Sequence, residues 1–279
     1  MASPKVLPLV FTDLDGTLLD HKSYSFSAAG DAITALAEQR IPLIFNTSKT
    51  RAESIALSKT IGLNHPVIVE NGGGIVFPKN YDFGHPFRSA DWDSGSRVIA
   101  LGADITEIKR VLKMADAKLH LEGAYRGFSD MSVEHLQEIT GLAYDEAAKA
   151  KQREFSEPLE WRATNETRQA LENYLHEYGL GLIAGGRFHH VIGEVDKCTA
   201  MVRAAHMYEN SADDQGQALT IALGDSKNDE QMLAGADIAV VVKNPAGSGL
   251  TIAHPDVIYT TKEGPEGWQE AIEQILPRL

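Results

Sequence analysis

The chain reads Leu7-Pro8-Leu9-Val10-Phe11-Thr12-Asp13-Leu14-Asp15-Gly16-Thr17 near its N-terminus. The apolar, β-forming part predicts a buried strand over residues 7–12, and the polar turn after it predicts a loop at the end of that strand. Strands that alternate with helices indicate a parallel sheet. Such an alternation follows here, with helical and strand patterns at residues 25–40, 41–46, 51–61 and 66–69.

The middle of the chain differs in character from its two ends. Strand patterns return near the C-terminus, at residues 219–223 and 237–242. The middle of the chain, at about residues 83–192, carries more charge and several aromatic residues. We therefore expect an α/β fold, with a Rossmann-like parallel-sheet core from residues 1–84 and 193–279 and an inserted α+β cap domain over residues 85–192. The chain crossings near residues 83–86 and 190–195 are expected to act as hinges. Helical patterns in the insert lie at residues 104–115, 132–140 and 167–178.

Composition excludes several classes of function. The chain has 26 Lys and Arg against 39 Asp and Glu, a net charge of −13, so nucleic acid is not an expected partner. Asp13 and Asp15 interrupt the apolar N-terminal run before it reaches the length of a membrane span. Cys198 is the only cysteine, which rules out an intrachain disulfide and favours a reducing compartment. We expect a cytoplasmic protein; the oligomeric state stays open.

Three polar clusters each follow a predicted strand. The loops at the carboxyl ends of parallel strands share one edge of the sheet, where ligands bind, so the clusters are expected to converge. Their carboxylates, at Asp13, Asp15, Asp225 and Asp229, are the oxygen ligands that Mg²⁺ takes. The sequence therefore predicts a Mg²⁺ site. The clusters are Asp13-x-Asp15, Thr47-Ser48-Lys49 and Gly224-Asp225-x-x-Asn228-Asp229.

This arrangement suits phosphoryl transfer from a small phosphorylated metabolite. A metal ion and a lysine offset the repulsion between a carboxylate and a phosphate monoester. We expect Asp13 to be the nucleophile that forms an aspartyl-phosphate. Asp15 is expected to protonate the leaving group and then to activate water. Alternation along an extended chain would point both side chains to the same side.

Two of these motifs resemble those of the haloacid dehalogenase superfamily of phosphatases. They are Asp13-Leu14-Asp15-Gly16-Thr17 and Gly224-Asp225-Ser226-Lys227-Asn228-Asp229. The resemblance implies that Thr47 binds the phosphoryl group and that Lys197 steadies nucleophile and phosphate. The position of the insert resembles the branch of this superfamily with a large α+β cap.

A closer resemblance is to the mannosyl-3-phosphoglycerate phosphatases, which implies the conversion of mannosyl-3-phosphoglycerate to mannosylglycerate and phosphate. A departure is Cys198, where a glycine is common in that family. Arg187 is the cation expected to meet the substrate carboxylate. The other expected substrate contacts are Ser48, Lys49, Glu70, Asn71, Gly72 and Asn228. The resemblance rests on residues 46–51, 70–73, 127–131, 140–142, 185–189 and 264–268.

Other interpretations remain open from sequence. Thr47-Ser48-Lys49 also fits a helix N-cap, Lys197 a solvated surface lysine, and Gly72 a hinge. His189 and His190 would face opposite ways on a strand, which argues against a shared metal. A less selective sugar-phosphate phosphatase is the alternative enzyme, and a phosphomutase is possible in principle. A non-enzymatic aspartyl-phosphate switch is disfavoured by Asp15, which would make the phosphoaspartate short-lived.

Overall fold

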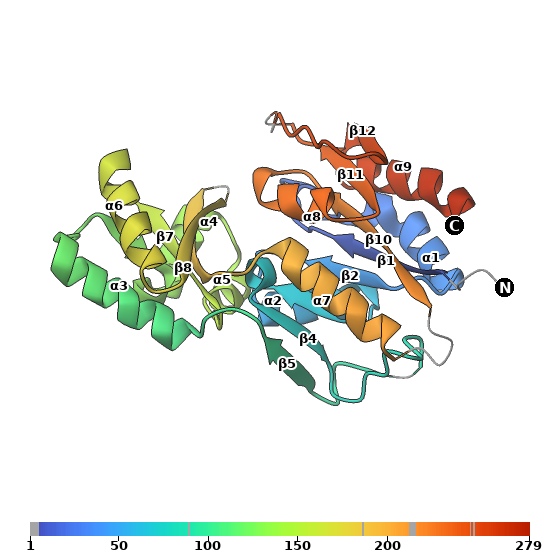
Figure 1. Ribbon diagram of the computed structural model, residues 1–279, viewed down its shortest axis with the longest axis horizontal. Helices are drawn as coiled ribbons and strands as arrows, with labels where there is room; N and C mark the ends of the chain where they lie inside the picture. The colour runs from blue at the N-terminus through green and yellow to red at the C-terminus, as the bar shows by residue number, and fades with distance from the viewer. Residues whose placement is uncertain (1–5, 89, 186, 212–215, 246, 248) are drawn as a thin grey trace.

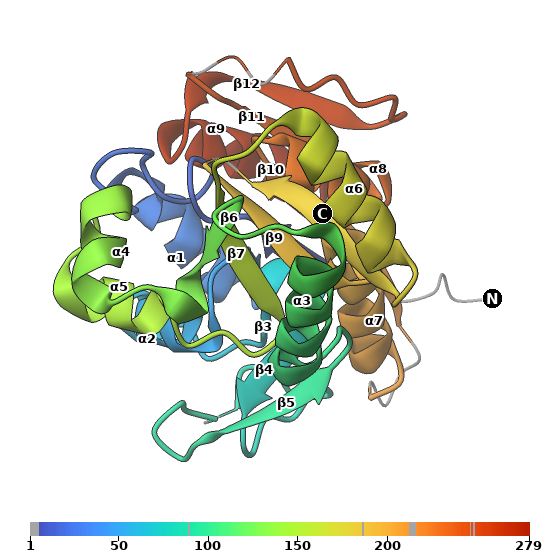
Figure 2. The ribbon, with the colours of Figure 1, turned by 90° about the vertical axis from the view of Figure 1, so that its left-hand side faces the viewer.

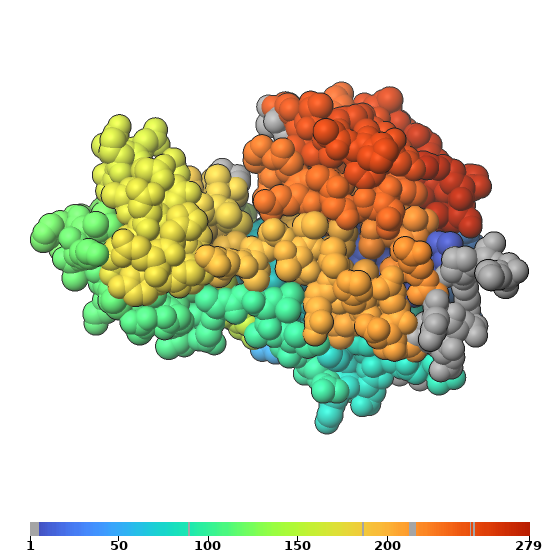
Figure 3. Space-filling view, in the orientation of Figure 1, coloured from blue at the N-terminus to red at the C-terminus, as the bar shows by residue number. Residues whose placement is uncertain are grey.

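The computed structural model describes residues 6–88, 90–185, 187–211, 216–245, 247 and 249–279. Its strands form one sheet of eight strands and one of four. Figure 1 shows them in two bodies, a core that holds both chain ends and a cap formed by one internal segment. The predicted α/β core with an inserted α+β cap is confirmed. In the space-filling view, a notch separates the upper parts of the two bodies (Figure 3).

The core sheet has the strand order β12-β11-β10-β1-β2-β3-β4-β5. All pairings from β12 to β3 are parallel, whereas β4 and β5 add an antiparallel edge. The sheet is therefore mixed, and β1 lies in its middle between β10 and β2. The strands are β1 Val6–Thr12, β2 Leu43–Asn46, β3 Val67–Val69, β4 Gly74–Pro78, β5 Ser96–Ala100, β10 Gln217–Gly224, β11 Ile238–Lys243 and β12 Val257–Glu263.

Helices cover both faces of the core sheet, which is why β1 is apolar on both sides. Val10 packs into the cluster formed with α1 and α9, and Phe11 into the cluster formed with α7 and α8. Both side chains are fully buried, as the alternation of a strand between two covered faces requires. The helices are α1 Gly30–Glu38, α2 Arg51–Ile61, α7 Lys197–Glu209, α8 Glu230–Ala234 and α9 Glu266–Ile275, with short 3₁₀ turns η1 Ser27–Ala29, η2 Glu70–Gly72, η4 Lys227–Asp229 and η5 Leu276–Arg278.

The cap is a four-stranded antiparallel sheet with the order β6-β7-β9-β8. Helices α3 and α6 bury one face of it, on the side away from the core, and the α4–α5 hairpin lies beside α2 (Figures 1 and 2). The other face of the cap sheet is turned to the core. The cap elements are α3 Ile105–Leu119, β6 Tyr125–Gly127, η3 Phe128–Asp130, α4 Val133–Thr140, α5 Tyr144–Ala150, β7 Ser156–Trp161, α6 Asn165–His176, β8 Leu180–Gly185 and β9 Phe188–Gly193.

The cap begins later in the chain than residue 85. Residues 96–100 form β5, which pairs with β4 in the core sheet. Leu101 and Gly102 then donate backbone N–H groups to the Gly73 carbonyl, both at 2.9 Å, before α3 starts. The first crossing is therefore at residues 101–104 instead of 83–86, and the second lies between β9 and α7. Strand β5 is only partly buried, and its sequence lacks the apolar run that marks the central strands.

The predicted helices agree with the structure, and α2 keeps its predicted bounds. Thr50 caps α2 through a reciprocal pair of contacts with Glu53, and Gly62 ends it at φ 85°. Helices α5, α7 and α8 have no counterpart among the ranges predicted as helical from the sequence. No helix in the described part of the chain is long and apolar enough to cross a membrane.

Candidate active site

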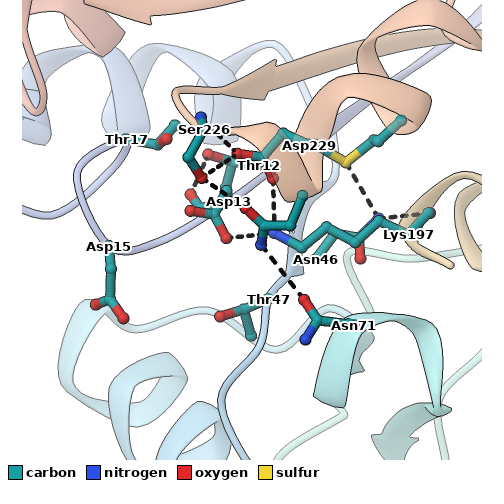
Figure 4. A network of polar contacts seen from close by, with 12 residues as sticks. Thr12, Asp13, Asp15, Thr17, Asn46, Thr47, Asn71, Lys197, Ser226 and Asp229 are labelled. Atoms are coloured by element: carbon teal, nitrogen blue, oxygen red, sulfur yellow. Dashed lines mark hydrogen bonds and ion pairs between the residues drawn. The ribbon is translucent and has the colours of Figure 1, made fainter. Parts of the chain in front are cut away.

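Neighbouring strands bring the first acidic residues together. The pairing of β1 with β10 continues one step past β1, because the Asp13 N–H donates to the Leu223 carbonyl at 2.9 Å. Asp13 and Asp225 therefore begin two adjacent loops at the carboxyl edge of the sheet. The turn η4 brings Asp229 back to the same place (Figure 4).

The carboxylates of Asp13, Asp225 and Asp229 form a buried cluster. One oxygen from each lies within 4.8 Å of the others. Asp229 is held in place by the backbone N–H groups of Asp225 and Ser226, both 3.1 Å from its Oδ2. A Cβ on Gly224 would lie 2.5 Å from the Asp229 Cβ, so this position requires a glycine.

Lys197 bridges the cluster from the first turn of α7. Its Nζ lies 2.6 Å from Asp13 Oδ1 and 2.7 Å from Asp229 Oδ1, and its side chain is 1% exposed. This burial excludes the alternative that Lys197 is a solvated surface residue. The Lys197 carbonyl accepts a 2.8 Å hydrogen bond from Asn46 Nδ2 at the end of β2, which fixes the start of α7 against the sheet.

The cluster carries more negative charge than Lys197 offsets. Burial raises the pKa of Asp13 well above its usual range, opposed by the Lys197 ammonium and reinforced by Asp229 and Asp225. Burial also raises the pKa of Asp225 to about 6, with Asp229 adding to the shift. Three buried carboxylates around one ammonium fit a divalent cation, and their hard oxygens fit Mg²⁺.

Further polar residues support the cluster, and they were not predicted as site residues. Thr17 Oγ1 donates to Asp225 Oδ1 at 3.1 Å, and Asn244 Nδ2 donates to Asp225 Oδ2 at 2.6 Å. Trp268 Nε1 donates to Thr12 Oγ1 at 3.0 Å, and that hydroxyl donates to the Asp13 carbonyl at 2.7 Å. Asn244 directly follows β11, and this strand-end position is the signal that could have identified it.

Asp15 does not join the cluster. Its carboxylate pairs with Lys49 Nζ at 2.8 Å, and Figure 4 shows it apart from Asp13. The expected alternation does not apply because β1 ends at Thr12 and the chain turns at Gly16, where φ is 82°. The geometry therefore gives no support to the Asp15 carboxylate as a metal ligand. Its side chain is 39% exposed, which leaves it open to an incoming group.

The loop after β2 faces the cluster from the other side. Thr47 is 1% exposed, and Figure 4 shows its hydroxyl between Asp15 and Asn71. That oxygen accepts the Lys49 N–H at 3.2 Å. The Ser48 carbonyl accepts from Arg153 Nη1 of the cap at 2.7 Å. The N-cap of α2 is Thr50, so this loop both precedes a helix and lies at the site.

Glu70 and Gly72 join the core to the cap. The Glu70 carboxylate is fully buried and accepts from the backbone N–H groups of Glu154 and Phe155, at 2.8 and 3.1 Å, and from the Ser156 hydroxyl at 2.5 Å. These three bonds hold the Glu70 carboxylate at the start of β7. A Cβ on Gly72 would lie 2.2 Å from the Asp196 carbonyl oxygen, so Gly72 permits close packing against the second crossing.

The remaining expected contacts lie in two places. Asn228 Nδ2 donates to Asn71 Oδ1 at 3.4 Å, and both residues line a cavity of about 270 Å³ beside Lys197. Arg187 is instead engaged within the cap, where its guanidinium donates to the carbonyls of Ile139 and Thr140 at 2.8 Å each. The structure does not bring Arg187 to the carboxylate cluster. Gly186, next to it in the motif, lies outside the described residues.

The fold and this site define a capped phosphoryl-transfer hydrolase. The chain matches the family model of haloacid dehalogenase-like hydrolases over residues 10–93 and 104–264. It belongs to this family, and it is a phosphoric monoester hydrolase.

Similar proteins extend over nearly the whole chain. It is 36% identical to a glucosyl-3-phosphoglycerate/mannosyl-3-phosphoglycerate phosphatase of Persephonella marina, covering 97% of this chain and 98% of that protein. A protein of the same name from Methanococcoides burtonii is also 36% identical, covering 96% and 97%. Among solved structures, a Bacteroides thetaiotaomicron phosphatase of the superfamily aligns with a TM-score of 0.65 at 17% identity, covering 96% of this chain and 95% of that one. The sucrose-phosphatase of Synechocystis aligns with a TM-score of 0.61 at 15% identity, covering 96% and 97%.

Proposed function

We propose that this protein hydrolyses the phosphate ester of a glycosyl-3-phosphoglycerate, with mannosyl-3-phosphoglycerate as the first candidate. The observation that carries the chemistry is the buried Asp13 carboxylate held at 2.6 Å by Lys197. The substrate is supported by the relatives named above, which share 36% of residues with this chain. A less selective sugar-phosphate phosphatase remains the alternative.

The first half of the reaction transfers the phosphoryl group to Asp13. An oxygen of its carboxylate attacks phosphorus, and the bond from phosphorus to the glycerate oxygen breaks. The Asp15 carboxyl gives its proton to that leaving oxygen. Lys197 holds the nucleophile, and the Thr47 hydroxyl donates a hydrogen bond to the phosphoryl group.

The second half releases phosphate. Asp15, now a carboxylate, takes a proton from water as the water oxygen attacks phosphorus, and the bond to Asp13 breaks. Asp13, Asp225 and Asp229 would hold Mg²⁺, which supplies positive charge against the phosphoryl oxygens. The cap residues then limit the access of bulk water, and cap closure about the two crossings stays a prediction.

The nucleophile is tested by Asp13→Asn. We expect kcat on an aryl phosphate to fall by about ten-thousandfold, because the amide is a poor nucleophile of nearly the same shape. Asp31→Asn, on the exposed side of α1, is the control and should keep full activity. Substantial residual activity of Asp13→Asn would disprove the assignment.

The metal and the substrate are tested separately. Chelation should abolish activity, and added Mg²⁺ should restore it. A panel of phosphorylated sugars with released phosphate as readout should favour the glycosyl-3-phosphoglycerates by orders of magnitude in kcat/KM. A flat panel would support the less selective enzyme.

A further inference from the structure

We propose that the leaving group of the substrate binds in the cavity on the Asp15 side of the site, where Lys49 recognises its carboxylate. The inference rests on the proposed function, because it takes Asp15 as the acid and a phosphoglycerate as the substrate. Lys49, a residue of the core, would then make the contact with the substrate carboxylate that was expected of Arg187.

This cavity, of about 310 Å³, lies where the core meets the α4–α5 hairpin of the cap. Its size is within the range of small-molecule pockets. Asp15 itself is not a lining residue, but two residues of the wall contact it: Leu19 forms a backbone bridge with Asp15, and Lys49 pairs with the Asp15 carboxylate. Lining residues include Leu19, Tyr24, Lys49, Ala56, Leu142 and Lys149.

The position of the acid decides between two cavities. The other one lies beside Lys197 and is walled by Ile183 and Ala184 of β8. A general acid must come within hydrogen-bond reach of the leaving oxygen. The Asp15 carboxylate contacts Lys49, which lines the first cavity and not the second. The leaving group therefore extends toward α2 and the α4–α5 hairpin.

The wall of this cavity carries two lysines and two glutamates, and only the lysines can bind an anion. Its two glutamates are engaged at helix N-termini: Glu53 accepts from the Thr50 N–H at 2.9 Å, and Glu146 from the Ala143 N–H at 3.2 Å. Two lysines line the same wall. Lys49 is mostly buried, and its pKa is raised because its pairing with Asp15 and Glu53 outweighs desolvation. A carboxylate near the leaving oxygen would meet this fixed cation.

The rest of the wall fits a glycosyl ring. Tyr24 is 41% exposed, and the Lys49 ammonium lies 5.2 Å from the centre of its ring. Phe26, Leu57 and Leu142 continue the apolar surface. Aromatic and aliphatic side chains beside a few polar groups are the usual lining of a small-molecule site.

The test of Lys49 compares two substrates that differ only in the carboxylate. One is mannosyl-3-phosphoglycerate, and in the other the carboxylate is reduced to a primary alcohol. Lys49→Met should lower kcat/KM for both, because Asp15 loses its partner, but at least tenfold more for the carboxylate substrate. The matched control is Lys227→Met, an exposed lysine at the other cavity, which should leave the ratio within about twofold.

A steric test uses alanines on the two cavities. Ala56→Trp should raise KM for the glycosyl substrate at least tenfold, and raise it less for 3-phosphoglycerate, which has no sugar. Ala184→Trp should change both by less than about twofold. Circular dichroism and thermal unfolding of each variant show that it has folded.

Several outcomes would overturn the inference. An unchanged substrate ratio in Lys49→Met would make Lys49 only a positioning residue for Asp15. Selective effects of Lys227→Met or Ala184→Trp would place the leaving group in the other cavity. An active Asp13→Asn variant would instead remove the proposed function itself, so the two failures are distinguishable.

Discussion

The core and the cap cover their sheets differently. The core sheet is buried under apolar clusters on both faces, whereas the cap sheet has its main cluster on the side of α3 and α6. Double coverage holds the strand ends in fixed positions, as the site with its buried charges requires. The half-covered cap sheet leaves a face directed at the core. The comparison shows that the carboxylate cluster belongs to the doubly covered core, whereas closure of the cap over a substrate stays a prediction.

The link between the two bodies combines apolar packing of Phe155 in a core cluster with several polar contacts. The polar contacts include the hydrogen bonds that the Glu70 carboxylate accepts at the start of β7 and the bond from Arg153 to the Ser48 carbonyl. Arg51 and Glu154 add an ion pair at 2.8 Å. Polar contacts of this kind can exchange with water when the bodies separate.

The largest effect is expected for Lys197→Met in the core. Removing the ammonium raises the pKa of Asp13 further, so this proposed nucleophile stays protonated over more of the pH range. We expect activity to fall by about a thousandfold. The free energy of unfolding should fall by about 3–5 kcal/mol, since the carboxylates lose their buried partner. Kinetics and urea unfolding test this; a variant with near-normal activity would contradict it.

A smaller effect is expected at the junction for Glu70→Gln. The new amide places an NH₂ group against N–H donors of the cap, at a cost of about 1–3 kcal/mol, and kcat/KM should fall because the cap is displaced. The matched control is Glu157→Gln, a buried carboxylate within the cap that accepts from the Ser129 N–H at 2.8 Å. It should lose stability and keep kcat/KM within threefold. Equal kinetic effects of both variants would argue against a special role for the junction.

His65 gives the core a pH-dependent stability. Burial lowers its folded-state pKa from 6.5 to about 4. The unfolded chain therefore binds a proton first as the pH falls, so stability is lost between pH 6.5 and about 4 and not further below. The loss is about 3 kcal/mol at most. His65→Phe should flatten this part of the curve in urea unfolding across pH; parallel curves for both proteins would contradict the prediction.

The smallest effect is expected for Arg51→Met, which removes the partly exposed ion pair across the junction. Such pairs contribute less than about 1 kcal/mol and are screened by salt. Unfolding at low and high salt should show a small difference that shrinks as salt is added. Arg110→Met removes a similar pair with Glu107 inside the cap and serves as the comparison. A loss of several kcal/mol for Arg51→Met would show that this pair locks the two bodies.

Sequence reasoning succeeded where local pattern decides position. Asp13, Asp225 and Asp229 lie together because each follows a buried apolar strand or its turn, which the sequence displays directly. The bounds of α2 were predictable because Thr50, Glu53 and Gly62 mark its ends. Strand ends and helix caps are short-range signals.

It failed where contacts between distant segments decide. Asp15 follows the same strand as Asp13, yet its partner Lys49 comes from another loop. Arg187 is engaged by carbonyl groups of α4, and Glu70 by the start of β7. No spacing along the chain displays these pairings. β5 was missed for a related reason, since its place at the sheet edge depends on pairing with β4 more than on its own apolar residues.

The central place of β1 has a consequence for protein synthesis. One edge of β1 pairs with β10, which the ribosome makes after the whole cap, and the hydroxyl that binds the Asp13 carbonyl is held by Trp268 near the C-terminus. A nascent chain that stops before Gln217 has β1 with one empty edge and Asp13 without Asp225 and Asp229. The proposed nucleophile is thus translated early and completes its site late, and a truncated product is expected to have no hydrolytic activity.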